Sequence, residues 1–336
     1  MTNAFAFTQE DKLSKLLTTD IADFWRTGHF SSFQGIDNKR INYASFIADQ
    51  PINCLIISPG RSESYLKYQE LVFDLARLNM SIFVIDHRGQ GLSERLLHNP
   101  HKGYVNKFDD YTDDLHTFIE TVVNPHCATN KPPLLLAHSM GGAIATRLIQ
   151  KYAQSVKAVL LSSPMIAINK GGLPEWVAKS LITTGNILNT LISDQAWYFL
   201  GQGDYQAKDF ASNHLMHSQI RYQTFIDLYQ AQPELQLGGV TFNWLKQAVL
   251  VQQKIFADLD KISTPITIMQ AGNDTIVDNS AQNKFCQQLN QYTPSLCQQS
   301  QPYVIEGAKH ELLFESDKYR NQALAFIENW LFENTE

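Results

Sequence analysis

Short runs of apolar residues recur along the chain, separated by longer stretches with helical periodicity. Most of the runs are continuously apolar and do not alternate with polar residues. This pattern is typical of strands that are buried on both faces of a parallel sheet. The predicted strands span residues 53–58, 81–86, 133–137, 156–162, 265–270 and 302–306.

The stretches between these strands place apolar residues three or four positions apart, as amphipathic helices do. The predicted helices span residues 64–78, 111–123, 140–152, 279–289 and 318–332. Alternating strands and helices favour the α/β class with a mostly parallel, doubly wound sheet. Nearer the N-terminus, residues 31–49 contain the run INYASFI (41–47), which we expect to form an antiparallel hairpin at the sheet edge.

The strand–helix rhythm stops between residues 164 and 258. We interpret this segment as a helical insertion, or cap, because it contains no buried-strand run within a strand–helix unit. The core then comprises residues 1–163 and 259–336. The apolar surface of the predicted cap is carried by Trp176, Val177, Leu181, Leu188, Leu191, Trp197 and Phe199.

The composition indicates a folded protein without a nucleic-acid partner. Of the 336 residues, 44% are hydrophobic, and 27 basic against 33 acidic side chains give a net charge of −6. This apolar content with a small net charge excludes intrinsic disorder. Nucleic-acid binding requires a clustered basic face, and the chain has no run of Lys or Arg that would supply one.

Location is predicted from the chain's start, its apolar runs and its cysteines. The start lacks the basic and apolar regions of a secretory signal, and no stretch approaches the roughly 18 apolar residues that span a bilayer. Cys54, Cys127, Cys286 and Cys297 stand far apart and form no C-x-x-C pair. We therefore expect free thiols in a reducing compartment, with Cys54 in the core, and a cytoplasmic protein.

A candidate nucleophile follows the third predicted strand. Ser139 lies in the sequence AHSMGG (137–142), directly before a predicted helix. In the G-x-S-x-G pattern, small neighbours allow a tight strand-to-helix turn that exposes the serine hydroxyl, and here Ala137 replaces the first glycine. The motif alone is weak, since Ser139 is otherwise a reasonable helix N-cap. Its position after a buried strand favours the nucleophile.

A serine nucleophile needs a base, and the base needs an orienting acid. Asp274 follows the fifth predicted strand and His310 follows the sixth. The chain order Ser, Asp, His is that of α/β-hydrolases, and all three residues follow strand carboxyl ends. Asp278 is the alternative acid, although it is also well placed to cap the helix that follows it.

The oxyanion of such a reaction needs two backbone N–H donors. We expect one from Met140, the residue after the nucleophile, and one from Arg61, in the loop after the first strand, where Gly60 allows a turn. The side chain of Arg61 is expected in a surface ion pair, with a phosphate contact as the alternative. No cofactor or metal is required by this chemistry.

The remaining histidines are interpreted as structural or surface residues. The pairs His98/His101 and His214/His217 have a spacing of three but no accompanying carboxylate or third ligand of the H-E-x-x-H kind. His138 is expected to pack or hydrogen-bond locally. The sequence DHRGQGLS (86–93) lacks the spacing and helix context of a dinucleotide-binding fingerprint, so it is read as a structural turn.

Four motifs resemble the bacterial lysophospholipase L2 family, in the monoacylglycerol-lipase-like branch of the α/β-hydrolases. They are IDHRGQG (85–91), LAHSMGG (136–142), GAKHE (307–311) and LFE (313–315), and similar segments extend over nearly the whole chain. The resemblance implies an α/β-hydrolase fold and hydrolysis of the acyl ester of lysophospholipids to a fatty acid and a glycerophosphodiester. It also implies peripheral contact with the inner face of the cytoplasmic membrane.

Several alternatives stay open at this stage. A monoacylglycerol lipase or a broad carboxylesterase would use the same catalytic residues, and a non-catalytic lipid-binding protein is a more distant possibility. A serine aminopeptidase is disfavoured, because no acidic cluster can be assigned to a substrate ammonium. The apolar residues of the cap either roof a groove for one acyl chain or pack on the core. A net charge of −6 predicts that membrane contact is apolar or uses a local basic patch.

Overall fold

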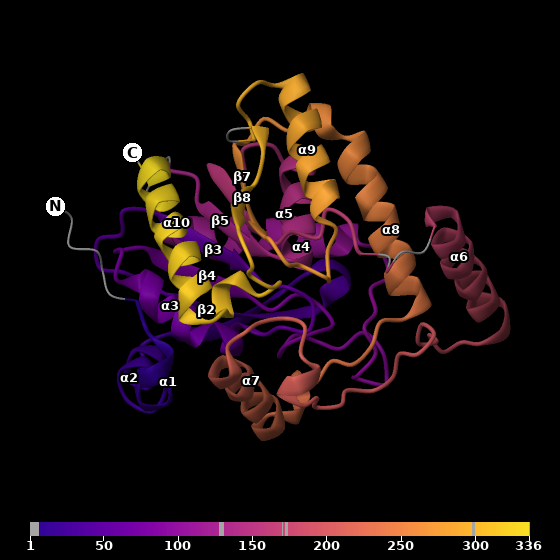
Figure 1. Cartoon of the computed structure of the whole chain (residues 1–336), viewed down its shortest axis with the longest axis horizontal. Helices are drawn as coiled ribbons and strands as arrows, with labels where there is room; N and C mark the ends of the chain where they lie inside the picture. The colour runs from indigo at the N-terminus through magenta and orange to yellow at the C-terminus, as the bar shows by residue number, and fades with distance from the viewer. Residues whose placement is uncertain (1–6, 128–130, 170, 172–173, 298–299, 336) are drawn as a thin grey trace.

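The computed structural model describes residues 7–127, 131–169, 171, 174–297 and 300–335 (Figure 1). Its centre is an eight-stranded sheet with the order β1-β2-β4-β3-β5-β6-β7-β8. Strands β3 to β8 run parallel, whereas β2 is antiparallel to both β1 and β4. The strands are β1 (His29–Gln34), β2 (Arg40–Phe46), β3 (Cys54–Ser58), β4 (Ser81–Ile85), β5 (Leu134–His138), β6 (Ala158–Ser162), β7 (Ile266–Ala271) and β8 (Tyr303–Ile305).

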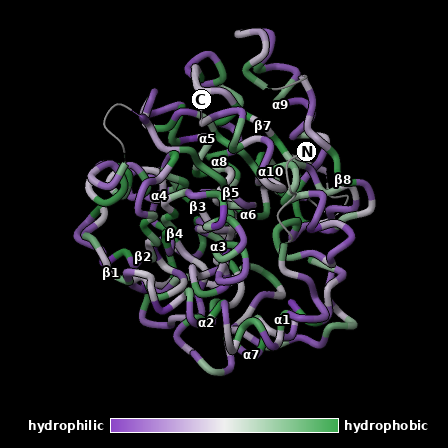
Figure 2. The backbone as a smooth tube through the Cα atoms, turned by 90° about the vertical axis from the view of Figure 1, so that its left-hand side faces the viewer, coloured by the Kyte–Doolittle hydropathy of each residue, from purple (hydrophilic) through white to green (hydrophobic). Residues whose placement is uncertain are grey.

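Helices cover both faces of the sheet, and alternate residues of the central strands point to opposite faces. In β3, Ile56 packs in the cluster that includes α4, α5 and α9, while Leu55 and Ile57 pack with α3 and α10. Figure 2 shows most hydrophilic stretches of the backbone at the periphery of the molecule. The helices are α1 (Glu10–Leu16), α2 (Asp20–Trp25), α3 (Gln69–Ala76), α4 (Asp109–Phe118), α5 (Met140–Lys151), α6 (Glu175–Ile192), α7 (Gln219–Ala231), α8 (Phe242–Ala257), α9 (Asn279–Tyr292) and α10 (Asp317–Thr335).

The sequence predictions of the sheet are confirmed. All six apolar runs form strands, and the expected edge hairpin is β1 paired with β2. The helix predicted from residue 64 begins as a 3-10 turn over Tyr65–Tyr68 before α3, and the helix predicted to residue 123 continues from α4 as a π-helical turn over Ile119–Val123. Helices α1 and α2 were not anticipated.

The expectation of free cysteines is wrong in this structure. Cys54 is buried in β3, as predicted, but it is bonded to Cys127, and Cys286 is bonded to Cys297. The Cα atoms lie 5.7 and 5.3 Å apart in the two pairs, within the range that a disulfide spans. Spacing along the chain does not reveal that distant cysteines meet in space, and the cysteines no longer support a reducing compartment.

The segment 164–258 contributes α6, α7 and α8, and its described residues form no strand apart from isolated bridges. Helix α8 packs in the core beside α5, with Trp244, Ala248, Val251 and Ile255 buried in the same cluster. The predicted boundary at 258 therefore places a core-packed helix in the cap. The division of the chain into core and cap stays a prediction.

Helix α6 turns much of its apolar surface away from the core, and Figure 1 shows it at the edge of the molecule. Polar Asn186 and Asn189 are buried, whereas Trp176 is 73% exposed and Leu191 77% exposed. Leu181 and Leu188 are exposed as well. These four side chains do not pack on the core, because helical periodicity defines an apolar face but not the neighbour it meets. Phe199 of the same predicted set does pack, with its ring centre 5.3 Å from that of Phe242 in α8. The groove for an acyl chain stays a prediction. Among the described residues, no helix combines the length and apolarity needed to cross a bilayer.

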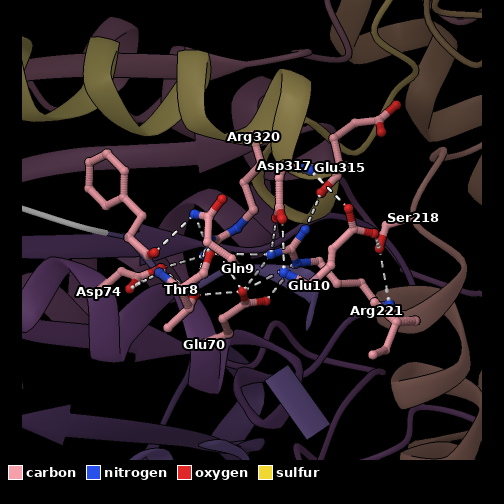
Figure 3. Close-up of polar contacts among 12 residues, drawn as sticks. Thr8, Gln9, Glu10, Glu70, Asp74, Ser218, Arg221, Glu315, Asp317 and Arg320 are labelled. Carbon is pink, nitrogen blue, oxygen red and sulfur yellow. Dashed lines mark hydrogen bonds and ion pairs between the residues drawn. The ribbon is translucent and has the colours of Figure 1, made fainter. Parts of the chain in front are cut away.

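Helix α7 is instead fixed to the core by a buried ionic cluster, shown in Figure 3. Arg221 of α7 is 1% exposed and donates to both carboxylate oxygens of Glu70 in α3, at 2.8 and 2.9 Å. It also donates to Asp317 at 2.9 Å, while Arg320 of α10 donates to Asp74 at 2.8 Å. Burial raises the pKa of Glu70, but the two arginines lower it by more, so the net shift is downward.

Candidate active site

Ser139 lies on a tight turn between β5 and α5, at the carboxyl edge of the sheet. Its backbone has φ 50° and ψ −115°, a left-handed conformation that costs energy in any residue but glycine. The turn requires glycine at two following positions: a Cβ atom on Gly141 would lie 2.1 Å from the Ser58 carbonyl oxygen, and one on Gly142 would lie 2.6 Å from Pro164. The Ser139 side chain does not cap α5, so the N-cap alternative is excluded.

His310 connects the predicted nucleophile to the predicted acid. Its Nε2 lies 2.9 Å from Ser139 Oγ, and its Nδ1 lies 2.7 Å from Asp274 Oδ2. The side chains of His310 and Asp274 are almost fully buried, and Ser139 is 9% exposed. Residues 171 positions apart thus form one hydrogen-bonded chain, in the geometry that nucleophilic catalysis by serine needs.

The environment of Asp274 keeps this carboxyl group ionised. Burial raises its pKa, but the hydrogen bond and charge of His310 and the backbone N–H groups of Ile276 and Val277 lower it by more. Asp278, the alternative acid, accepts hydrogen bonds from Ser280 N and Ala281 N and caps α9. Asp278 therefore has the capping role that the sequence also allowed.

The loop after β3 lies against the nucleophile. Strands β3 and β5 pair in register with Ser58 opposite Ala137, so their carboxyl ends lie side by side. A Cβ atom on Gly60 would lie 3.2 Å from Ser139 Cβ. Met140, the first residue of α5, directly follows Ser139 in the chain. Arg61 follows Gly60 in the loop after the neighbouring strand β3, so both predicted N–H donors lie near Ser139. Their catalytic role stays a prediction.

The expected surface ion pair of Arg61 is not formed. Its two terminal nitrogens donate to the carbonyl oxygen of Gly238 at 3.0 and 3.1 Å, and its guanidinium carbon lies 5.7 Å from the Trp244 ring centre. Burial lowers the pKa of Arg61 to about 10, and Tyr111 opposes that shift only in part. The guanidinium is held by cap and core together, without a carboxylate partner among the described residues.

A buried charged cluster that the sequence did not reveal joins the loops around this site. Lys67 Nζ donates to Glu63 Oε1 at 2.5 Å and to Glu311 Oε2 at 2.8 Å. Glu63 Oε2 also accepts the N–H of Gly60 at 2.5 Å, and Glu311 directly follows His310. The cluster therefore ties the loop after β3 to the loop that carries His310. The only sequence signals were the spacing of four between Glu63 and Lys67 and the carboxylate next to His310.

The ammonium of Lys67 controls what this cluster can bind. Burial raises the pKa of Glu63, but the charges of Lys67 and His138 lower it by more, to about 2. Glu63, His138 and Glu311 offer ligand atoms close enough for a metal ion, yet Lys67 Nζ already donates to both carboxylates. The same contact leaves these carboxylates unsuited to receive a substrate ammonium, as an aminopeptidase would require.

The other residues considered in the sequence have structural contacts. His138 Nδ1 lies 3.3 Å from the Ser162 carbonyl oxygen, and burial lowers the pKa of His138. Asp86 is buried and accepts hydrogen bonds from Ser64, Tyr65 N and Leu92 N. The sequence 86–93 thus forms a structural turn, as predicted. His217 contacts Glu315, and none of the four paired histidines belongs to a metal-binding group of the described residues.

Comparisons with known proteins agree on the type of fold. Residues 49–317 match the model of the family Hydrolase_4, described as serine aminopeptidase, S33. The crystal structure of a soluble variant of monoglyceride lipase from Saccharomyces cerevisiae is 18% identical, with a TM-score of 0.70 over 92% of this chain and 95% of that chain. A thermostable carboxyl esterase from Bacillus coagulans is 15% identical, also with a TM-score of 0.70, over 92% and 99%. The chain has the α/β-hydrolase fold.

Two curated relatives share a more specific similarity. Lysophospholipase L2 of Escherichia coli strain K12 is 36% identical over 320 residues, which cover 95% of this chain and 92% of the relative. Probable lysophospholipase L2 of Haemophilus influenzae is 33% identical over 82% of this chain and 83% of the relative. Monoglyceride lipase of Rattus norvegicus is 26% identical over 84% and 82%.

Proposed function

The chain belongs to the lysophospholipase L2 family of α/β-hydrolases, and from this premise we propose that it is a serine hydrolase that cleaves the acyl ester of lysophospholipids. The products are a free fatty acid and a glycerophosphodiester. The observation that supports the proposal most directly is the buried contact of His310 with both Ser139 and Asp274. The names of the two relatives support the substrate class.

In the proposed acylation step, His310 Nε2 accepts the hydroxyl proton of Ser139 while Oγ attacks the ester carbonyl carbon. The N–H groups of Met140 and Arg61 stabilise the oxyanion that forms, an effect worth about 10²–10³ in rate for one donor in a comparable site. Asp274 holds the neutral imidazole in the tautomer with its proton on Nδ1 and stabilises the imidazolium that forms. The carbonyl then re-forms, and the His310 imidazolium protonates the departing glycerol oxygen.

Deacylation repeats the same proton movements with water. His310 accepts a proton from a water molecule that attacks the acyl-enzyme, and the proton then passes to Ser139 Oγ as the fatty acid leaves. The residues that carry these steps need no metal or cofactor. That expectation follows from the chemistry and stays part of the proposal.

A monoacylglycerol lipase is the second candidate, and the 26% identity with a monoglyceride lipase supports it. The decisive measurement is fatty-acid release from lysophosphatidylcholine and from a monoacylglycerol of the same chain length, with wild type and Ser139→Ala. Preference for the lysophospholipid, lost in the variant, is the expected result. Preference for the monoacylglycerol would reject the substrate assignment but keep the nucleophile.

Two further outcomes would reject the mechanism itself. Fatty-acid release that Ser139→Ala leaves unchanged would show that another group attacks the ester. Failure of the wild-type protein to react with a fluorophosphonate probe, together with lipid binding, would instead favour a non-catalytic lipid-binding protein.

We also propose that α6 makes peripheral contact with the membrane that supplies the substrate. Its exposed apolar side chains match the prediction of an apolar attachment for a protein of net charge −6. Replacing Leu191 and Ile192 by Glu should weaken binding to phosphatidylcholine vesicles by about ten-fold or more, because each buried side chain contributes roughly 1.5–3 kcal/mol. Binding that salt abolishes, or that the double variant retains, would reject this contact.

A location at the inner face of the cytoplasmic membrane remains part of the proposal, and the disulfides provide its test. Disulfides are rare in reducing compartments. Alkylation of protein from freshly lysed cells, followed by mass spectrometry, reports whether Cys54, Cys127, Cys286 and Cys297 are reduced. Four free thiols in cells would support the cytoplasmic side, and stable pairs would reject it.

A further inference from the structure

A cavity of about 190 Å³ lies between the predicted cap and the loops of the active site. One side is formed by residues 61–63 and Glu311, next to His310, and the other by α7 and the segment before it. Pockets for drug-sized ligands usually enclose roughly 300–1,000 Å³, so this cavity has room for one headgroup and not for a whole lipid. Its lining is largely aromatic and apolar, with a few charged side chains among them. Its lining includes Glu311, the neighbour of His310, but neither Ser139 nor His310 itself.

Three cationic side chains line the cavity, and two of them have no carboxylate partner among the described residues. Lys67 is paired with Glu63 and Glu311. The guanidinium of Arg61 donates to a carbonyl oxygen and lies over an aromatic ring, and neither Arg61 nor exposed Lys208 forms an ion pair with the described residues. The charged lining residues therefore sum to one positive charge.

A buried hydroxyl completes the lining. Tyr205 Oη is inaccessible to solvent and has no hydrogen-bond partner among the described residues. By contrast, Tyr229 on the same wall donates its hydroxyl to the Ser62 carbonyl oxygen at 2.9 Å. A buried polar group without a partner is costly, so the Tyr205 hydroxyl is a donor that a ligand can satisfy.

We propose that this cavity is the headgroup subsite of the enzyme and that Arg61, Lys208 and Tyr205 bind the phosphodiester of a lysophospholipid. The assignment rests on the proposed function. A lysophospholipid carries its ester and its phosphate at opposite ends of a three-carbon glycerol. The backbone N–H of Arg61 faces the ester in the proposed mechanism, and Arg61 also lines the cavity, so the same residue would contact both groups of the substrate.

The choice of phosphodiester follows from charge and geometry. A guanidinium presents several N–H donors in a plane that matches phosphate oxygens, and a buried cation without a carboxylate gains most from an anionic ligand. The carboxylates of Glu63 and Glu311 do not oppose this, because Lys67 donates to both of them. A monoacylglycerol offers only hydroxyl groups here and leaves the guanidinium without a counter-ion.

The first test compares two arginines that both donate to a backbone carbonyl oxygen of the predicted cap. Arg95 donates to the Glu234 carbonyl oxygen, as Arg61 does to Gly238, but Arg95 does not line the cavity. Arg61→Gln should lower the ratio of kcat/KM for lysophosphatidylcholine to kcat/KM for monoacylglycerol by about ten-fold, the value of one charge-assisted hydrogen bond. Arg95→Gln should change this ratio by less than about two-fold. Equal changes in both variants would overturn the proposal and leave Arg61 as a cap contact.

The second test does not depend on hydrolysis. Calorimetry with Ser139→Ala protein should detect binding of sn-glycero-3-phosphocholine, and adding Arg61→Gln should weaken it by about ten-fold. Absence of binding, or binding that the double variant retains, would overturn the headgroup subsite even if the catalytic mechanism holds. Inorganic phosphate bound as tightly as the headgroup would also overturn the assignment to a lipid. A failure of the proposed mechanism alone would leave this binding intact.

Discussion

Helices α6 and α7 belong to the same predicted cap but meet the rest of the molecule in opposite ways. In α7 a charged residue, Arg221, is fully buried and bonded to carboxylates of α3 and α10. In α6 asparagines are buried, while Trp176 and Leu191 are largely exposed. One helix directs its polar group inward and the other its apolar groups outward.

The ion pairs of α7 and the apolar face of α6 suit different roles. Buried ion pairs with good hydrogen-bond geometry are directional, so they fix the orientation of α7 and hence of Tyr222, Phe225 and Tyr229, which wall the cavity. Apolar contact is non-directional and tolerates a fluid partner. The fixed helix therefore shapes the substrate site, and the outward face suits a lipid surface.

The largest loss of stability is expected when the ionic contacts that anchor α7 are removed. Arg221→Met removes the two-point contact of the Glu70 carboxylate and leaves it the Thr8 hydroxyl and a longer contact to Arg320, so we expect a loss of about 3–5 kcal/mol in the free energy of unfolding. Urea denaturation measures it. Arg26→Met, which removes an exposed ion pair with Asp23, is the control and should cost less than about 1 kcal/mol. Equal losses would mean that the buried cluster does not anchor the helix.

The next effect is a pH dependence at the cluster beside the active site. The folded-state pKa of Glu63 is about 2, below its ordinary value of 4.5, so its ionisation stabilises the fold above about pH 4.5 and this contribution is lost as the pH falls toward 2. Between pH 6 and pH 3 the free energy of unfolding should fall by about 2 kcal/mol more in wild type than in Glu63→Gln. Exposed Glu333→Gln should behave as wild type. Parallel pH profiles of wild type and Glu63→Gln would refute the coupling.

A smaller effect concerns catalysis. Glu63 accepts the N–H of Gly60 and so holds the loop that carries the Arg61 donor. Glu63→Gln should lower kcat by about ten-fold and change KM by less than two-fold, because a displaced oxyanion donor acts mainly on the transition state. Glu70→Gln, at a buried carboxylate in the α7 cluster, controls for lost stability. A raised KM with unchanged kcat would contradict the positioning role.

The smallest expected effect sharpens the contrast within α6. Leu191→Ala should change the free energy of unfolding by less than about 0.5 kcal/mol, since the side chain contacts little protein. Ile182→Ala, on the buried side of the same helix, should cost about 2 kcal/mol or more. Chemical denaturation of the two variants measures both changes in the free energy of unfolding. A large loss at Leu191 would show that its exposed face packs on protein.

Much of the fold could be predicted because strand and helix periods are local properties. The continuous apolar runs identified all six parallel strands, and the positions of Ser139, Asp274 and His310 after strand ends predicted that they meet. Parallel strands end at one edge, so residues far apart in sequence but at equivalent strand ends converge there.

The rest depended on contacts that local patterns do not encode. The charged cluster of Lys67 joins residues up to 244 positions apart, and each member looks like an ordinary surface residue in sequence. The cysteine pairs were missed for the same reason. The outward face of α6 was misread because an amphipathic helix shows the same period whether its apolar side meets the core or a lipid.

The ionic cluster around Glu70 also has a consequence for synthesis of the protein on the ribosome. Glu70 and Asp74 are translated early, whereas Arg221 follows Glu70 by 151 residues and Arg320 follows Asp74 by 246. Until those arginines emerge, α3 has carboxylates that cannot be buried without cost. We expect the nascent chain to remain sensitive to protease at α3 until α10 has left the ribosome, long after the central strands can begin to pair.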